Sequence, residues 1–185
     1  MTNEVAVFLA NGFEEIEAIS TIDILRRAGL KVLTVSIETE KWVTGAHNIN
    51  IKADSLFDEQ LFTQTKMLVL PGGMPGTNNL NEHADLKKLI SEFYTQKKHI
   101  AAICAAPLIL GQLNLLTNKK ATCYPGFEKE LKNAQIQNSQ AVVVDDNIIT
   151  AKGVGAAIEF ALQLVEILVN KETAEQLSKD LVINK

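Results

Sequence analysis

An apolar run passes directly into a helical pattern in the stretch His99-Ile-Ala-Ala-Ile-Cys104-Ala-Ala-Pro107-Leu-Ile-Leu-Gly111. The run before the cysteine is short, rich in small residues and apolar throughout, as is typical of a central buried strand. Pro107 suits the first turn of a helix, where its missing N–H costs nothing. The stretch therefore predicts a strand that ends at Cys104 and a helix that begins just after it.

Two interpretations of Cys104 remain open from this stretch alone. At a strand-to-helix joint, a thiol faces the free amides and partial positive charge of a helix start, and both favour the thiolate. Alternatively, Cys104 is a buried structural cysteine, because free cysteine is among the most buried residue types. The second cysteine, Cys123, is interpreted either as a resolving thiol or as an unreactive strand residue.

Strands and helices alternate upstream of this stretch. An apolar run at 5–10 ends at the turn signal Asn11-Gly12, and the helix that follows is acidic in its first turns and ends at Gly29. Residues 30–37 alternate in apolar and β-branched types, and residues 66–70 form another apolar run that leads into the loop at 71–76. Residues 82–97 have apolar side chains at helical spacing. This order predicts an α/β fold with a mainly parallel central sheet and helices on both faces.

Shorter elements complete the pattern. Residues 42–52 are interpreted as two short strands joined near Gly45, residues 121–124 as a short strand, and residues 127–131 as a helical turn. Residues 140–144 and 148–151 form a predicted strand pair closed by Lys152-Gly153, and residues 155–169 a largely buried helix. A chain of 185 residues without linkers or repeats suits a single domain over 1–185.

Composition narrows the class of partner. Hydrophobic residues make up 46% and charged residues 22% of the chain, and no run is long enough to span a membrane. The net charge of −4, without a basic cluster, predicts binding neither to nucleic acid nor to an anionic membrane. Two cysteines and no leader pattern favour a cytoplasmic protein with free thiols. Small molecules or proteins are the expected partners.

Binding and catalytic sites of open parallel sheets lie at the carboxyl ends of strands. Three predicted loops begin at such ends, namely 11–17, 71–76 and the turn at Cys104. If their strands are neighbours, Glu17, the Gly72-Gly73 backbone and Cys104 share one crevice. The amides of Gly72, Gly73 and Ala105 would then receive an oxyanion, although glycines after a strand are often only a turn. Positions four, seven and eleven beyond Glu17 are mostly apolar, so its carboxyl group is a candidate for burial, a raised pKa and a hydrogen bond to a thiolate. Glu14 and Glu15 are interpreted as helix-start acids in solvent.

The histidines offer no partner for Cys104. His99 lies about 16 Å away at strand rise, which is too far for base catalysis. His83 begins a surface helix and is expected in solvent, and His47 lies in the short strand pair with its direction undetermined. No Cys, His and carboxylate group has metal-ligand spacing, and the glycine loop lacks the lysine and hydroxyl of a phosphate-binding loop. We therefore expect neither a metal nor another cofactor.

Five stretches together resemble a known family: LANGFEEIE at 9–17, DILRRAG at 23–29, LPGG at 70–73, AAICAAP at 101–107, and 150–161 with its Glu-Phe-Ala end. The pattern resembles the ThiJ/PfpI superfamily, in the branch of the parkinsonism-associated deglycase and its bacterial relatives. The resemblance implies a flavodoxin-like three-layer sandwich of the class I glutamine amidotransferase-like type, usually a homodimer. It also implies that Cys104 is the nucleophile, Glu17 the protonated acid beside it, and Gly72, Gly73 and Ala105 the oxyanion pocket. The residue matching Arg27 approaches the partner subunit's site in this family.

The chain departs from the family pattern near the cysteine. Tyr124 stands where many relatives of this branch have a histidine, and tyrosine is a poor base near neutral pH, although it can donate a hydrogen bond. Ala106 replaces a frequent glycine. The protease-like branch has histidine directly after its cysteine, so Ala105 argues against a protease.

Two functional hypotheses follow. The first is a cofactor-free enzyme of the glutathione-independent glyoxalase or deglycase type, in which Cys104 attacks reactive dicarbonyls or their early adducts. The second is a non-catalytic oxidative-stress sensor or redox-regulated chaperone that uses oxidation of Cys104.

Overall fold

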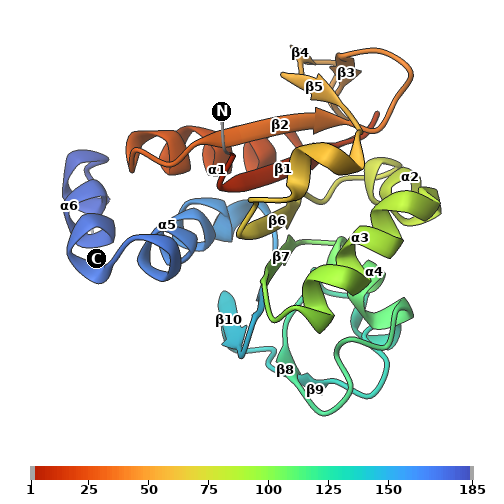
Figure 1. The fold of residues 1–185 in the computed structure, drawn as a ribbon. Coiled ribbons are helices and arrows are strands. Elements are labelled where there is room, and N and C mark those ends of the chain that lie inside the picture. Colours follow the sequence, from red (N-terminus) through yellow and green to blue (C-terminus); the bar gives the residue numbers. More distant parts are fainter. Residues whose placement is uncertain (1–2, 184–185) are drawn as a thin grey trace.

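The computed structural model describes residues 3–183 and contains a seven-stranded sheet within them (Figure 1). Neighbouring strands pair in parallel, except for the antiparallel pair at one edge. In spatial order the strands are β10 (Val142–Asp145), β11 (Ile148–Ala151), β7 (His99–Ile103), β6 (Met67–Leu70), β1 (Val5–Leu9), β2 (Val32–Ser36) and β5 (Ser55–Leu56).

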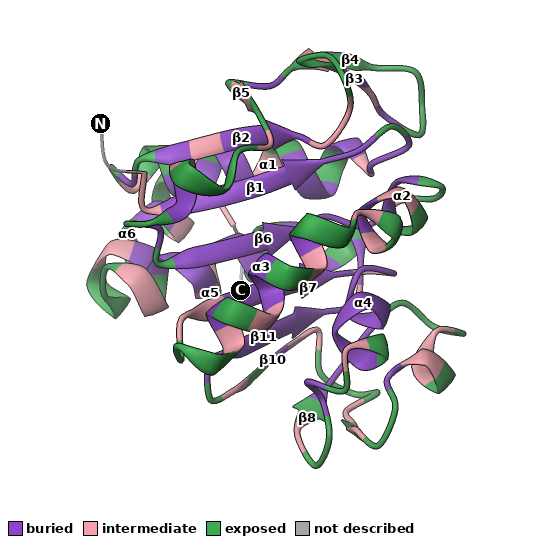
Figure 2. Cartoon of the chain, turned by 45° about the vertical axis from the view of Figure 1, so that its right-hand side comes forward, coloured by how far each residue is buried: buried purple, intermediate pink, exposed green. Residues whose placement is uncertain are grey.

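Helices cover both faces of this sheet. They are α1 (Glu15–Arg27), α2 (Gly76–Glu82), α3 (Ala84–Thr95), α4 (Pro107–Gln112), α5 (Ala157–Leu168) and α6 (Lys171–Asp180). Successive side chains of a strand point to opposite faces, and β1 is apolar at every position, so it contributes to two cores. Val5, Val7 and Leu9 pack in a core with α1 and α5, whereas Ala6 and Phe8 pack in a second core with α3 and α4. Figure 2 shows the central strands as continuously buried. The predicted flavodoxin-like sandwich is confirmed.

Local sequence signals account for several helix boundaries. The helix α1 has Arg26 and Arg27 in its last turn and is followed by Gly29 at φ +81°, a conformation that glycine adopts at little cost. Pro107 occupies the first turn of α4, as predicted. His83 caps α3, because its ring Nδ1 accepts a hydrogen bond of 3.1 Å from the Leu86 amide. The ring also lies 4.8 Å from that of Phe57, so the expectation of a solvated His83 is wrong.

Smaller elements agree with the sequence only in part. β3 (Trp42–Thr44) and β4 (Asn50–Lys52) form the predicted antiparallel pair, and a 3₁₀ helix at Glu128–Glu130 supplies the predicted turn. The expected strand at 121–124 is wrong beyond its first residue. β8 (Lys120–Ala121) pairs with β9 (Gln135–Ile136) and ends before Cys123, which leaves Tyr124 in a loop. Further 3₁₀ helices lie at Glu59–Phe62 and Val154–Ala156.

Strand order fixes where loops can meet. The chain runs from β1 outward to β2 and returns to the other side of β1 at β6, so the order reverses between β1 and β6. Loops at the carboxyl ends of strands on either side of such a reversal form a crevice. Here these are the loops after β1, β6 and β7, as predicted. Across residues 3–183, the helices are too short or too polar to cross a lipid bilayer.

Candidate active site

Cys104 lies at the sharp joint between β7 and the turn that leads into α4. Its backbone has φ +65°, a left-handed conformation that a non-glycine residue rarely adopts. Two neighbouring segments hold it there: the Cys104 amide donates to the Ala151 carbonyl at 2.9 Å, and the Tyr124 amide donates to the Cys104 carbonyl at 2.8 Å. Such a joint directs the side chain away from the sheet, and the thiol is half-buried.

Glu17 lies in the first turn of α1 and reaches into the same crevice. Its side chain is fully buried, Oε2 accepts a 2.9 Å hydrogen bond from the Gly72 amide, and the carboxyl group lies beside the side chain of Cys104. Oε1 has no hydrogen-bond partner among the described residues. Burial raises the pKa of Glu17 to about 7, although the hydrogen bond from the Gly72 amide lowers it. The carboxyl group therefore stays protonated up to a pH well above that at which glutamate usually ionises.

The thiol of Cys104 is harder to ionise than its position predicts. Burial raises its pKa to about 12, with further contributions from the charge of Glu17 and the hydrogen bond to Glu17. The amides of Gly73 and Ala105 hydrogen-bond to the sulfur and lower the pKa, but by less. The amides after the strand thus favour the thiolate, as expected, but burial and a neighbouring carboxylate outweigh them. A proton on Glu17 removes the repulsion between the two groups, so the two titrate as a pair.

The amides of Gly72, Gly73 and Ala105, which were expected to bind one oxyanion together, have different partners in the structure. Gly73 and Ala105 direct their N–H groups at the sulfur, whereas the Gly72 amide is already bonded to Glu17. Gly72 must also lack a side chain, since a Cβ there would lie 2.5 Å from Cys104 Cβ and 2.7 Å from Glu17 Oε2. Gly72 thus holds Glu17 against Cys104, and it offers no free amide to an oxyanion.

Two further residues line the crevice. A Cβ on Gly153 would lie 3.6 Å from both Cys104 Sγ and Glu17 Oε1, and 3.2 Å from Tyr124 Cδ2. From the sequence, Gly153 is predicted only to close a strand pair. Its place directly after β11, the strand beside β7, is the feature that could have assigned it to the crevice. Tyr124 is half-exposed beside this glycine.

Cys123 points away from the crevice into the core, where burial raises its pKa to about 11 and makes it a poor nucleophile.

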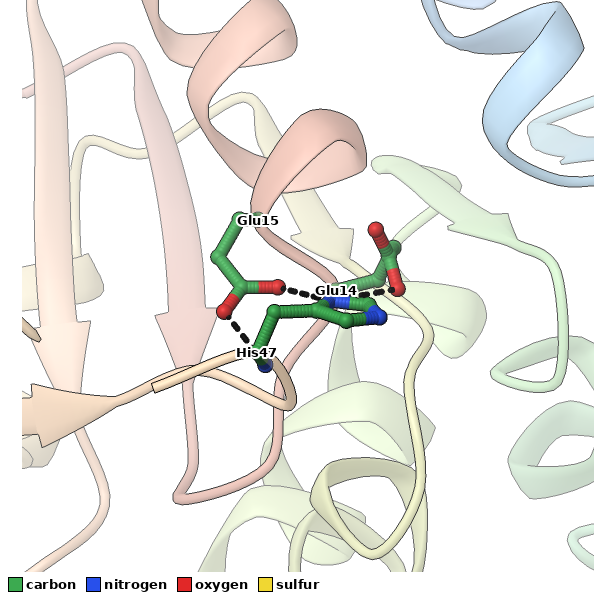
Figure 3. A group of neighbouring side chains, drawn as sticks. All are labelled: Glu14, Glu15 and His47. Atoms are coloured by element: carbon green, nitrogen blue, oxygen red, sulfur yellow. Dashed lines mark hydrogen bonds and ion pairs between the residues drawn. The ribbon is translucent and has the colours of Figure 1, made fainter. Parts of the chain in front are cut away.

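A second cluster lies at the start of α1, where Glu14 and Glu15 meet His47 (Figure 3). His47 Nδ1 lies 2.8 Å from Glu15 Oε2 and 3.7 Å from Glu14 Oε2, and the His47 amide donates to Glu15 Oε1 at 2.7 Å. Glu15 is only 3% exposed, so the expectation of a solvated acid is wrong for it. The physical reason is tertiary: the turn between β3 and β4 closes over the helix start and supplies His47.

Arg27 stands apart from these groups. It lies at the opposite end of α1 from Glu17, about 15 Å along the helix axis, and forms a 2.6 Å ion pair with Asp23. The pair is exposed. The structure does not bring Arg27 into the crevice of its own chain.

Comparison with known proteins places this geometry in a family. The sequence profile of the DJ-1/PfpI family matches residues 3–167. The chain is 38% identical over 98% of its length to Protein DJ-1 homolog B of Arabidopsis thaliana, and it spans only 42% of that protein's length. It is 33% identical to the glutathione-independent glyoxalase DJR-1.2 of Caenorhabditis elegans, with 93% of the chain and 91% of the relative covered. The solved structure of oxidized Toxoplasma gondii DJ-1 superposes with a TM-score of 0.93 at 37% identity, covering 99% of this chain and all of the other.

Proposed function

Because the chain belongs to the DJ-1/PfpI family, we propose that it is a cysteine-dependent, cofactor-free enzyme of the glyoxalase or deglycase type. The substrates are reactive dicarbonyls, with methylglyoxal as the simplest probe, or the early adducts that they form on amines and thiols. The relative named as a glutathione-independent glyoxalase supports this class of reaction.

The observation that carries the proposal is the close approach of the buried Glu17 carboxyl group to Cys104, because one Cβ on Gly72 would lie 2.7 Å from Glu17 Oε2 and 2.5 Å from Cys104 Cβ. A neutral carboxylic acid donates a hydrogen bond to a thiolate, whereas a carboxylate repels it. With one proton shared by the pair, the form that has the proton on Glu17 carries the thiolate nucleophile. The same proton is then available to the substrate.

In the first half of the reaction, the Cys104 thiolate attacks the aldehyde carbon of a 2-oxoaldehyde and a C–S bond forms. The carbonyl electron pair moves to oxygen, and the amides of Gly73 and Ala105, which face the sulfur, receive the developing alkoxide. Glu17 gives its proton to that oxygen and becomes a carboxylate beside a neutral hemithioacetal.

In the second half, the Glu17 carboxylate removes the proton from the carbon bonded to sulfur and returns it to the neighbouring carbon. The hydroxyl proton of the hemithioacetal passes at the same time to the ketone oxygen. The former aldehyde carbon is thereby oxidised to a thioester while the ketone is reduced to an alcohol, so no external oxidant or reductant is consumed. Water then attacks the thioester, the C–S bond breaks, and a 2-hydroxy acid leaves with the thiol regenerated. Overall, the oxoaldehyde and one water give the hydroxy acid.

The test is conversion of methylglyoxal to lactate by purified protein without added glutathione, followed by proton NMR, with and without a chelator. We expect lactate to form at the same rate in both. Consumption of methylglyoxal without lactate, or a requirement for glutathione, would contradict the proposal.

A second candidate function rests on the same cysteine. Glu17 Oε1 is buried and unpartnered within residues 3–183, and it faces the crevice beside Sγ, where an oxidised sulfur would find a hydrogen-bond donor. Oxidation of the thiolate to the sulfinate consumes two equivalents of hydrogen peroxide and releases two of water. The solved relative from Toxoplasma gondii is described as oxidized. Intact mass after mild peroxide treatment tests this function: a gain of two oxygens on Cys104 supports sensing, and an unmodified thiol contradicts it.

Arg27 has a role in the proposed reaction only if the protein forms a homodimer. Because it lies far from the crevice of its own chain, it can act only in a homodimer that brings it to the partner's crevice. Sedimentation of the wild type and of Arg27→Ala, together with their turnover of methylglyoxal, tests this role. A dimer with a lower rate in the variant supports it, and an unchanged rate contradicts it.

A further inference from the structure

Three potential metal ligands converge from two segments of the chain at the start of α1. His47 is 32 residues from Glu15 in sequence, so spacing along the chain does not reveal the group. Each residue offers one ligand atom, and these atoms all lie within 4.8 Å of one another. Figure 3 shows the imidazole of His47 lying between the two carboxyl groups.

The two acids of the cluster share a single ionisable partner within residues 3–183. Glu15 keeps its carboxylate in a nearly buried position, with 4% of the side chain exposed, and Glu14 is 13% exposed beside it. Among residues 3–183, the ion pairs of these two acids involve only His47, and no lysine or arginine reaches them. Placing two carboxylates together away from water is costly unless a cation lies between them. In the metal-free protein the His47 ring and the amides of His47 and Ile49 hydrogen-bond to Glu15, and a bound metal ion would take over the contact that the ring makes.

The cluster is held on one side and open on the other. The backbone of Gly45 packs against the carboxyl group of Glu15 so closely that a Cβ there would collide with it. The His47 side chain is 68% exposed, so water reaches the cluster from the outside. Three protein ligands with one open side are the arrangement of zinc sites that keep a water ligand.

We propose that Glu14 Oε2, Glu15 Oε2 and His47 Nδ1 form a binding site for one divalent transition-metal ion of the zinc type. Ligands of a tetrahedral zinc ion at about 2.0–2.1 Å lie about 3.3 Å from one another. The N···O distances here are 2.8 and 3.7 Å, and all three ligand atoms lie within 4.8 Å of one another, so the two carboxyl groups must close on the ion by at most about 1.5 Å. The ion takes the place of the proton between His47 and Glu15. The nitrogen ligand selects this class over Mg²⁺ and Ca²⁺, which prefer oxygen ligands.

The site is separate from the catalytic pair. It contains neither Cys104 nor Glu17, although the Glu14 amide donates to the Gly72 carbonyl at 2.9 Å and the charge of Glu14 acts on Glu17. The inference therefore does not depend on the proposed enzyme activity.

Calorimetric titration of Zn²⁺ into the metal-free protein tests the site. We expect one ion per chain, an affinity that falls by about tenfold or more in His47→Gln, and little response to Mg²⁺. Two controls are matched to this test. In Cys104→Ala binding persists, which excludes the thiol as a ligand, and in His83→Asn it persists because this histidine caps another helix and asparagine replaces the cap.

Thermal unfolding provides a second readout. Saturating Zn²⁺ raises the midpoint of the wild type, because a ligand that binds only the folded state stabilises it, and the same concentration raises the midpoint of His47→Gln by less. Equal affinity in the wild type and His47→Gln, loss of binding in Cys104→Ala, or no saturable binding would each overturn the proposal.

Discussion

The carboxyl group of Glu17 lies beside the side chain of Cys104 at the carboxyl ends of β1 and β7, so close that one Cβ on Gly72 would touch both. Burial raises the pKa of both groups, to about 7 for Glu17 and about 12 for Cys104. Over the range between these values the pair holds one proton. Its position on the carboxyl group or on the sulfur decides whether the thiolate is present, so the chemistry of the crevice depends on the pair.

Turnover of methylglyoxal should rise with pH as this pair loses its first proton. We expect kcat/KM of the wild type to increase with a midpoint near pH 7, where Glu17 titrates, and then to level off. Glutamine has no titrating proton, so Glu17→Gln should lose this rise and about 100-fold or more in rate. The exposed change Glu166→Gln on α5 serves as the control. A pH profile shared by the wild type and Glu17→Gln would contradict the role of the pair.

The same pKa makes folding stability depend on pH. The pKa of Glu17 is about 7 in the folded protein and 4.5 for an unperturbed glutamate, so between these values the unfolded chain binds fewer protons. Stability is therefore fully present below pH 4.5 and is lost as pH rises through 7, by about 3 kcal/mol. Urea unfolding of the wild type and Glu17→Gln from about pH 4 to 8 measures this. The stability difference between them should change over that range, and a constant difference would be inconsistent with a buried, protonated Glu17.

Gly72→Ala should separate the pair without removing either member. The new Cβ would lie 2.5 Å from Cys104 Cβ and 2.7 Å from Glu17 Oε2, so one of them must move. We expect turnover of methylglyoxal to fall by about 100-fold, as small misplacements of reacting groups do. Gly155→Ala is the control, because no atom lies within 4 Å of its Cβ position. Full activity of Gly72→Ala would show that the close approach is unimportant.

Tyr124 contacts Cys104 through its backbone amide, which donates to the Cys104 carbonyl at 2.8 Å. The hydroxyl group has no hydrogen bond within the described part of the chain. We therefore expect Tyr124→Phe to lower kcat/KM by less than about tenfold, whereas an acid or base contributes about 100-fold or more. Steady-state kinetics at pH 7 decides between these outcomes, and a loss of the larger size would assign acid–base chemistry to Tyr124.

Much of the fold could be predicted because single stretches of sequence determine it. The apolar runs of β1 and β7 require burial on both faces, and Pro107 marks the start of α4. The apolar stripe beyond Glu17 indicates the burial that the structure confirms. These signals are local, so they can be seen without the rest of the chain.

Other features depend on competing or distant effects. The helix α6 buries only Ala174 and Leu177, which is too weak a periodicity to predict, and α2 is rich in asparagine and glycine, which are poor helix formers. The ionisation of Cys104 depends on how far burial outweighs two amides, and residue types do not specify that balance. Glu15 is buried by His47 from another segment, so its environment exists only in the folded chain.

The role of Cys104 is tested most directly by methylglyoxal turnover without glutathione in Cys104→Ala, measured beside Cys123→Ala and the wild type. We predict that Cys104→Ala makes no lactate above the uncatalysed rate. Cys123→Ala should keep its activity, because this buried thiol takes no part in the reaction. Lactate formation by Cys104→Ala at the wild-type rate would contradict the central role of the cysteine.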